Sequence, residues 1–424
     1  MYVQDVYEGW LAAGAEAKKR WVLYLYAFHG KEEVLSVLSW QLGEWADHSR
    51  GAIAAETVRA IALRGSTEAL LFVDQISRKH KSRQVKNAAV AALADAAQEL
   101  GISREELEDQ LVPDLGFDDK AEQIFDYGSR TFTVRLSECL EAEIYDENGK
   151  CLCLNHLPRP GKKDEEEKAK AAQATFRQMK KQLKTVADSQ KIRLLQALRA
   201  ARLWEKEQWE ALFIKNPVMH QFAMGLIWGV YEDRTLTATF RYMEDGSFNT
   251  AENEPYTLSD TGKIGIVHPL ELDEKVLTAW KEHLLDYEVG QPFDQLSRPV
   301  FGVSEDNREE HMFDGLYGKT LEVRTLSGKL LGAGWYRGKI EDAGFFSNYY
   351  RKDGSLGAEL TFSGCSVGYE NPVVTVYSLY FYRLDTNMQF HKKNQMKLFE
   401  VPARYFSEVV LELVQVVGDI SVHE

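Results

Sequence analysis

The first hundred residues place apolar side chains every three or four positions. Val6, Trp10, Trp21 and Leu25 begin this pattern. It continues through the segments 31–46, 52–65, 66–80 and 82–101. A repeat of this period gathers the apolar side chains on one face of an α-helix. The sequence therefore predicts that residues 1–112 form a series of amphipathic helices.

Glycine and serine residues mark where these helices end and begin. Gly65 and Gly101 each follow a predicted helix, as C′ glycines do. Ser66 and Ser103 are placed as N-caps of the next helices, and Glu106 stands at the capping-box position relative to Ser103. The two glycines are 36 positions apart (101 − 65), close to the period of paired-helix repeats. We expect a short HEAT-like segment here, with the concave protein-binding face that such repeats present.

The pattern changes from helical spacing to alternation after the segment LVPDLG (111–116). Residues 131–136 alternate, and residues 141–154 hold the Asn148-Gly149 pair that favours a hairpin turn. Further strands are expected at 234–243 and 264–267. Helices are expected at 164–187, 189–203, 205–214, 218–229 and 273–286. This mixture predicts a second domain over residues 113–301.

The last part of the chain, residues 302–424, is predicted to be rich in strands. From residue 319 onward the segments KTLEVRTL, KLLGAGWYRG, GAELTFSG and PVVTVYSLYFYRL have strand composition. A closing helix is expected over 407–417, capped by Ser407 and packed through Leu411, Val414 and Val417. The predicted fold class is therefore α+β, with the helical repeats first.

Composition narrows the function classes. The chain has 424 residues, a net charge of −14, 44% hydrophobic residues and four cysteines. The charge disfavours non-specific nucleic-acid coating, which depends on neutralised phosphates. No signal peptide and no apolar run long enough to cross a bilayer stands out. With so few cysteines, we expect a cytoplasmic protein with reduced thiols.

The short motifs in the sequence do not have the spacing of metal or cofactor sites. Cys151 and Cys153 lack the second pair of ligands that a tetrahedral zinc site needs, so they are interpreted as structural cysteines. GAGWYRG (332–338) has the wrong spacing for a nucleotide loop and continues into strand composition. No P-loop motif occurs. We expect no metal and no cofactor.

Residues 216–301 hold the candidate site, because several polar side chains stand there among apolar ones. His268 ends a predicted strand, so it could act as an acid or base in a cleft or could be a structural latch. Arg241 and Arg298 could grip an anion or pair with an internal acid. Gln291 and Gln295 could orient a ligand or satisfy backbone groups. Trp228 is a further ligand-binding candidate, although its pattern is also that of a core residue.

The main basic run is RKHKSRQVK (78–86), at a predicted turn between two helices. Such a ridge could contact nucleic acid or an acidic protein, or it could be a solvated loop. Aromatic residues also alternate over 376–384, which is typical of a strand packed on a core. We expect nucleic-acid binding to be weak or absent.

Six segments together resemble a bacterial family often called MolR-like, a domain of unknown function. They are LEDQLVPDLGF (107–117), RLLQALRAARLW (193–204), NPVMHQFAMGLIW (216–228), FRYMEDGSF (240–248), IVHPLEL (266–272) and QPFDQLSRPV (291–300). The resemblance covers about residue 50 to the C-terminus. Because helical composition begins directly after Met1, the chain is expected to be a fragment or a short member of a longer family.

The resemblance implies a protein-assembly setting and supplies no catalytic residues. Longer relatives carry helical repeats and sometimes a nucleic-acid-binding WGR domain, which has no counterpart in this sequence. Some relatives are encoded near AAA-type ATPases. We therefore expect a non-catalytic interaction or scaffold module with a protein partner and of unassigned oligomeric state. The alternative is a ligand or catalytic pocket in residues 216–300 that uses His268 and Arg298.

Overall fold

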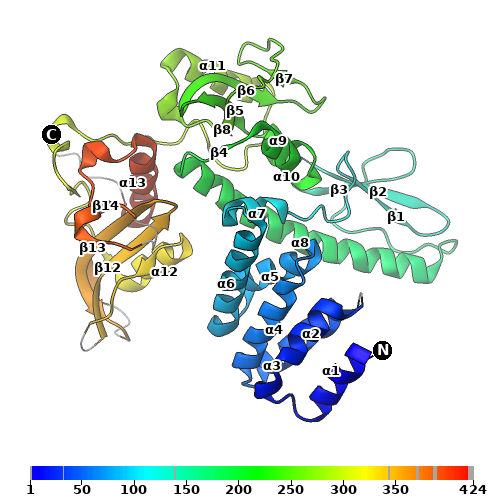
Figure 1. Cartoon of the computed structure of the whole chain (residues 1–424). Helices are drawn as coiled ribbons and strands as arrows, with labels where there is room; N and C mark the ends of the chain where they lie inside the picture. The colour runs from blue at the N-terminus through cyan, green and yellow to red at the C-terminus, as the bar shows by residue number, and fades with distance from the viewer. Residues whose placement is uncertain are drawn as a thin grey trace. The chain divides into compact units, whose positions relative to one another are not determined.

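The computed structural model describes residues 2–31, 33–137, 140–341, 344–368, 372–384 and 389–418. The structure is 47% helical and 19% strand, which confirms the α+β class. The chain divides into two compact units, and Figure 1 labels their helices and strands. The first comprises Met1–Phe125 with Ala211–His220, and the second comprises Asp126–Glu210 with Gln221–Glu424.

The first unit is a stack of helices around one apolar core. They are α1 (Tyr2–Ala12), α2 (Trp21–His29), α3 (Val34–Asp47), α4 (Gly51–Leu63), α5 (Thr67–Lys79), α6 (Arg83–Leu100) and α7 (Arg104–Gln110), followed by strand β1 (Glu122–Asp126). Leu23, Leu38, Val58 and Leu93, from four different helices, are fully buried in this core. Helical spacing of apolar residues thus predicted these elements well.

The predicted caps are present in this unit. The Ser66 hydroxyl accepts a hydrogen bond from the Ala69 amide, and Ser103 with Glu106 forms a complete capping box. Gly101 ends α6 in the left-handed conformation, with a φ of 69°. Glycine adopts this conformation without the steric cost that a Cβ brings.

The second unit begins with a hairpin and a long helix and continues into an antiparallel sheet. Its elements are β2 (Thr131–Leu136), β3 (Ala142–Tyr145), α8 (Glu166–Arg199), β4 (Leu203–Trp204), α9 (Lys206–Trp209), β5 (Ile227–Glu232), β6 (Thr235–Tyr242), β7 (Phe248–Asn249), β8 (Lys263–Ile266) and α11 (Glu274–Asp286). In the chain, a π-helical turn (Glu210–Ile214) and α10 (Pro217–Met224) come between α9 and β5, and Ala211–His220 of this stretch belong to the first unit. The sheet order is β4-β8-β5-β6-β7. Trp280 of α11 packs against Ile227 of β5.

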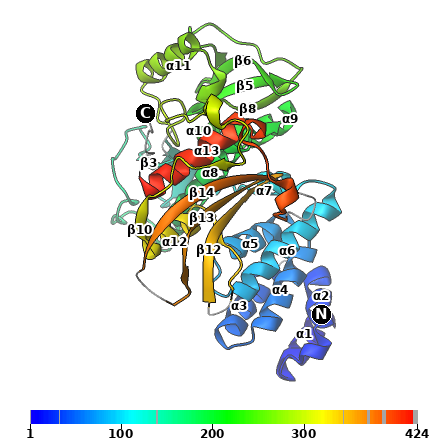
Figure 2. The ribbon, with the colours of Figure 1, turned by 90° about the vertical axis from the view of Figure 1, so that its left-hand side faces the viewer.

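A second sheet and two helices complete this unit. The elements are β9 (Met312–Phe313), β10 (Thr320–Glu322), α12 (Val323–Gly332), β11 (Tyr336–Arg337), β12 (Phe345–Asp353), β13 (Leu356–Ser366), β14 (Val373–Arg383) and α13 (Ala403–Val417). The sheet order is β10-β14-β13-β12-β11, with β9 paired to β14. Helices α12 and α13 pack on this sheet in one core that includes Leu326, Leu360 and Val409 (Figure 2).

Several element predictions were wrong. Residues 323–332 form α12 instead of a strand, because Val323, Leu326 and Leu330 bury one helical face. The helix predicted over 218–229 ends at Met224, and the missed strand β5 begins at Ile227. The two helices predicted over 164–203 are the single helix α8, which ends at Arg199.

The closing helix also begins earlier than predicted. It starts at Ala403, so Ser407 lies inside it and is not its cap. The buried Ser407 hydroxyl instead accepts a hydrogen bond from the Phe301 amide at 2.9 Å. None of the helices in the described part of the chain has the length and apolar composition needed to cross a membrane.

Candidate functional site

Helix α13 is largely buried among apolar side chains, and it carries a row of charged residues along one face. Arg404, Glu408 and Glu412 are spaced four residues apart, which places them along one side of a helix. Arg404 and Glu408 are buried, with 7% and 2% exposure, and Glu412 is half-buried. We call these three residues the α13 polar stripe. Each of them anchors a different polar cluster.

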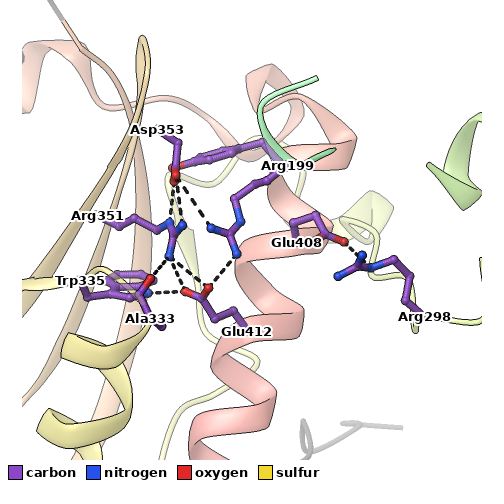
Figure 3. Close-up of polar contacts among 9 residues, drawn as sticks. Arg199, Arg298, Ala333, Trp335, Arg351, Asp353, Glu408 and Glu412 are labelled. Carbon is purple, nitrogen blue, oxygen red and sulfur yellow. Dashed lines mark hydrogen bonds and ion pairs between the residues drawn. The ribbon is translucent and has the colours of Figure 1, made fainter. Parts of the chain in front are cut away.

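Glu412 is the centre of the first cluster (Figure 3). Its carboxylate accepts hydrogen bonds from Arg351 Nη1 at 2.8 and 3.0 Å and from the Trp335 indole at 2.5 Å. Arg199, at the end of α8, is the third donor residue, and its Nη2 lies 2.7 Å from the Glu412 carboxylate. Burial raises the pKa of Glu412, whereas Arg351 and the Trp335 hydrogen bond lower it. Because two guanidinium groups face this carboxylate, it is charged at neutral pH.

Asp353 balances the second positive charge of this cluster. Arg351 donates from Nε and Nη2 to the two Asp353 carboxylate oxygens, at 2.6 and 3.1 Å. Arg351 Nη1 also donates to the Ala333 carbonyl at 2.7 Å, and Tyr405 donates to Asp353 at 3.1 Å. Two arginines thus face two carboxylates, which gives the desolvated cluster no net charge.

The second cluster contains two of the residues that the sequence singled out. His268 Nε2 lies 3.1 Å from Glu408 Oε1, and Arg298 Nε lies 2.9 Å from the same oxygen (Figure 3 shows the Arg298 contact). His268 has 0% exposure, and the Arg298 side chain has 10%. The structure therefore brings His268 and Arg298 together through an acid on α13 that is 140 residues away from His268 in the sequence.

Both ring nitrogens of His268 are engaged. Nδ1 accepts a hydrogen bond from the Leu270 amide at 3.2 Å, so it carries no proton, and Nε2 donates to Glu408. Burial lowers the pKa of His268, an effect that Glu408 opposes. The ring is therefore neutral at pH 7 and caps the short 3₁₀ turn Pro269–Glu271. This geometry favours the latch interpretation of His268.

Arg404 forms the third cluster. Its guanidinium donates to the Leu198 and Ile266 carbonyls and to the Tyr231 hydroxyl, and it forms an ion pair with Glu271. The Glu271 carboxylate also accepts from the Tyr231 hydroxyl at 2.8 Å. Burial raises the pKa of Tyr231, so this phenol stays protonated and can donate. Arg404 thereby ties α13 to the end of α8 and to strands β5 and β8.

Arg241 lies on β6, away from the clusters of α13. Its Nε donates to the Met224 carbonyl at 2.9 Å, and its Nη1 lies 3.4 Å from His283 Nε2. The guanidinium also stacks over the Tyr287 ring, with 5.5 Å to the centroid. Burial and the charge of Arg241 lower the pKa of His283. Arg241 thus closes the C-terminal end of α10, where carbonyl groups lack helical partners.

The two glutamines lie together against the start of β5. The Gln295 side chain accepts from the Ile227 amide at 2.9 Å and donates to the Ile227 and Val267 carbonyls, both at 2.8 Å. Gln291 Nε2 donates to the Gly225 carbonyl at 3.1 Å. Gln295 has 0% exposure and bonds to the backbone as a neighbouring strand would. This is the backbone-satisfying alternative that the sequence left open.

Trp228 lies in an aromatic core. Its indole donates to the Ala223 carbonyl at 2.9 Å, and its ring contacts those of Trp204 and Trp209 edge-on. Trp204, Trp209, Trp228 and Trp280 are all buried, as predicted. Trp204 and Trp228 occupy strands, however, and not the helices that were predicted for them.

The remaining sequence motifs lie at the surface. Lys81, Arg83 and Lys86 of the basic run are exposed at the turn between α5 and α6, while the side chains of Arg78 and Lys79 lie outside the described residues. Cys139 also lies outside them. Cys153 is exposed and Cys151 half-buried, so neither is a core cysteine, whereas Cys365 is buried. Among the residues that the structure describes, no three His, Cys, Asp or Glu side chains are grouped to hold a metal ion.

Sequence reasoning missed all three residues of the polar stripe and most of their partners. The missed residues are Tyr231, Glu271, Arg199, Arg351, Asp353, Arg404, Glu408 and Glu412. One signal was available in ARYFSEVVLELVQVV, because its charges recur every four residues inside an apolar helix. Charges in that setting require partners. The identity of those partners depends on contacts between distant parts of the chain.

Comparison with known proteins gives a family without an assigned function. Residues 152–335 match the family described as Domain of unknown function (DUF4132). The chain is 34% identical over 345 residues to "Uncharacterized protein YehI" of Escherichia coli (strain K12). That match covers 81% of this chain but 28% of the relative, so the chain spans less than a third of that protein's length. No solved structure matches the chain.

The matched region contains part of the polar clusters. Arg199, His268, Arg298 and Trp335 fall within residues 152–335, whereas Arg351 and the polar stripe follow it. The matched segment and the C-terminal sheet therefore share one set of buried ion pairs.

Proposed function

We propose that this chain is a non-catalytic protein-interaction or scaffold module. The observation that carries the proposal is an exposed aromatic stripe on α2, in the first unit. Trp21 is 56% exposed, Phe28 is 61% exposed, and Leu25 between them is half-buried. These residues are four and three positions apart, so they lie along one side of the helix. We call them the α2 stripe.

The composition of α2 supports a partner for this stripe. The helix reads WVLYLYAFH, and His29 at its end is its only basic or acidic residue. Its other side buries Val22, Leu23, Tyr26 and Ala27 in the core of the unit. A helix that is apolar all round is usually covered on all sides. Tryptophan and other aromatic residues are also the side chains that most often dominate protein interfaces.

The family context extends this proposal. The resemblance to MolR-like proteins suggests work beside an AAA-type ATPase in the cytoplasm, with the first unit as a HEAT-like segment. Solenoid repeats bind partners through their helical faces, which agrees with an exposed stripe there. Nucleic acid is not the proposed partner, since the basic run is short and the chain has a net charge of −14.

Replacing both Trp21 and Phe28 with serine is expected to lower partner capture at least about tenfold, the factor that corresponds to losing about 1.4 kcal/mol of binding energy. The full-length tagged chain would be expressed in its native host, and co-purified proteins would be quantified by mass spectrometry. Leu285→Ser is the matched control, because Leu285 is 76% exposed on α11 in the other unit. The control should keep the partner.

Recovery of the same stoichiometric partner by wild type and by the double variant would show that the α2 stripe is not the binding surface. Recovery of no partner by wild type, or turnover of a nucleotide or sugar by the purified chain, would contradict the scaffold proposal. Matching melting temperatures of the variants and wild type would show that the substitutions act on the surface alone.

The second candidate function is anion binding at Arg298. Among the described residues, Arg298 Nη1 is buried without a hydrogen-bond partner. A buried guanidinium with donors unused can bind a carboxylate or phosphate. His268 already uses both ring nitrogens, so of these two residues Arg298 is the one with a donor left for a ligand. The second candidate is therefore an anion site at Arg298, beside Glu408.

Thermal melting in phosphate tests this candidate. If an anion binds Arg298, phosphate should raise the melting temperature above that in chloride at equal ionic strength, because a ligand that binds the native state stabilises it. The gain should vanish in Arg298→Gln and persist in Arg177→Gln, an exposed arginine of α8. Equal melting in both salts, with a strongly destabilised Arg298→Gln protein, would assign Arg298 a structural role only.

A further inference from the structure

Cys151 and Cys153 form a close thiol pair at the return arm of the β3 hairpin. The backbone of Cys151 pairs with that of Tyr145 in an isolated antiparallel β-bridge, and the Leu152 amide donates to the Ile144 carbonyl at 2.8 Å. The turn before them is fixed by Asp146, whose carboxylate accepts from the Asn148 and Lys150 amides. These contacts hold Cys151 in position as the chain leaves the hairpin.

The backbone at Cys153 brings the two sulfurs together. Along a regular strand, residues two apart point to the same side but are separated by about 6.6 Å. Here the Sγ atoms are 3.8 Å apart. Cys153 has a φ of 49°, the left-handed conformation that few residues other than glycine adopt. This conformation ends the strand and accompanies the sulfur–sulfur contact.

We propose that Cys151 and Cys153 form a dithiol site that small disulfides of the glutathione class oxidise to an intramolecular disulfide, and that trivalent arsenicals bind with two sulfurs. The site is open to such reagents, since Cys153 is exposed and Cys151 is half-buried. Cys365 differs, because it is buried in the core of the C-terminal sheet.

The exchange proceeds in two balanced steps. The Cys153 thiolate attacks one sulfur of the external disulfide, which forms a mixed disulfide and releases one small thiolate. The Cys151 thiolate then attacks Cys153 Sγ, forms the Cys151–Cys153 bond and releases the second small thiolate. The two protons lost by the cysteines end on the two released thiols. The protein pair is oxidised, and the external disulfide is reduced.

The chemistry of the pair fits two-sulfur ligands better than zinc. A tetrahedral zinc site needs three or four protein ligands. In the described part of the chain, no third His, Cys, Asp or Glu completes such a set. Arsenic(III) with one organic group needs two thiolates only.

Phenylarsine oxide is the probe for this site. The reduced full-length chain should bind one equivalent, and Cys151→Ser and Cys153→Ser should each weaken binding at least about tenfold, or about 1.4 kcal/mol. Cys365→Ser and Cys139→Ser are the controls and should bind as wild type does. Wild-type affinity in either single variant of the pair, or no binding by wild type, would overturn the proposal.

Oxidised glutathione gives an independent readout. Wild type should lose two hydrogen atoms in the peptide that contains both cysteines, whereas Cys151→Ser should stop at the mixed disulfide on Cys153. Unchanged melting of both variants would confirm that the substitutions leave the fold intact. A stable mixed disulfide in wild type, or a disulfide that peptide mapping assigns to Cys139, would contradict the inferred pair.

Discussion

Replacing Glu412 with alanine is expected to lower the free energy of unfolding by about 3–5 kcal/mol, because it leaves buried positive charge without its partner. Glu412 accepts hydrogen bonds from Arg351, Arg199 and Trp335. Without it, Arg199 keeps only the 3.8 Å contact to Asp353 among the ion pairs of this cluster. Urea denaturation at pH 7, followed by tryptophan fluorescence, measures the change.

Gln415→Ala is the matched control, since Gln415 is exposed on the same helix. It should change stability by no more than about 0.5 kcal/mol. Glu412→Gln should fall between the two, because an amide oxygen still accepts from Trp335 but brings no charge. A loss below about 1 kcal/mol for Glu412→Ala would show that water reaches the two arginines and solvates them, as at an exposed pair.

The helical first unit could be predicted from sequence because its signals are local. Helical spacing, the Ser103–Glu106 capping box and the glycine after α6 all lie within a few residues of what they determine. Residues 323–332 show the limit of such signals. They follow one short strand and precede another, and their helical state depends on Leu326 and Leu330 reaching the core of the C-terminal sheet.

Three of the polar residues that the sequence singled out, Arg241, His268 and Gln295, are buried, but their chemistry could not be predicted. A polar side chain among apolar ones can bind a ligand, or it can equally well satisfy a backbone group that has no other partner. His268 and Gln295 illustrate this, because each bonds to backbone groups that sequence cannot place beside them. The acid that faces His268 and Arg298 comes from α13, which no local pattern connects to them.

Gln295→Met is expected to lower the free energy of unfolding by about 2–6 kcal/mol, since two buried backbone groups lose a bond worth about 1–3 kcal/mol each when left unsatisfied. These groups are the Ile227 amide and the Val267 carbonyl. Methionine keeps the length of the side chain and removes its donor and acceptor. The Ile227 carbonyl is less affected, because the Val267 amide also donates to it at 3.2 Å.

Hydrogen exchange can separate this effect from a general loss of packing. In Gln295→Met, exchange in the peptide that holds Ile227 should speed up relative to wild type by more than exchange in the strands of the other sheet. The Ile227 amide has lost the side-chain acceptor that protected it. Gln291→Met is the control: Gln291 is half-buried and donates to the Gly225 carbonyl at 3.1 Å, so its loss should cost about 1–3 kcal/mol. A loss of less than about 1 kcal/mol in Gln295→Met would contradict the strand-like role of Gln295. Such a result would mean that the start of β5 finds another partner, a water molecule or a shifted neighbour, once the amide is removed.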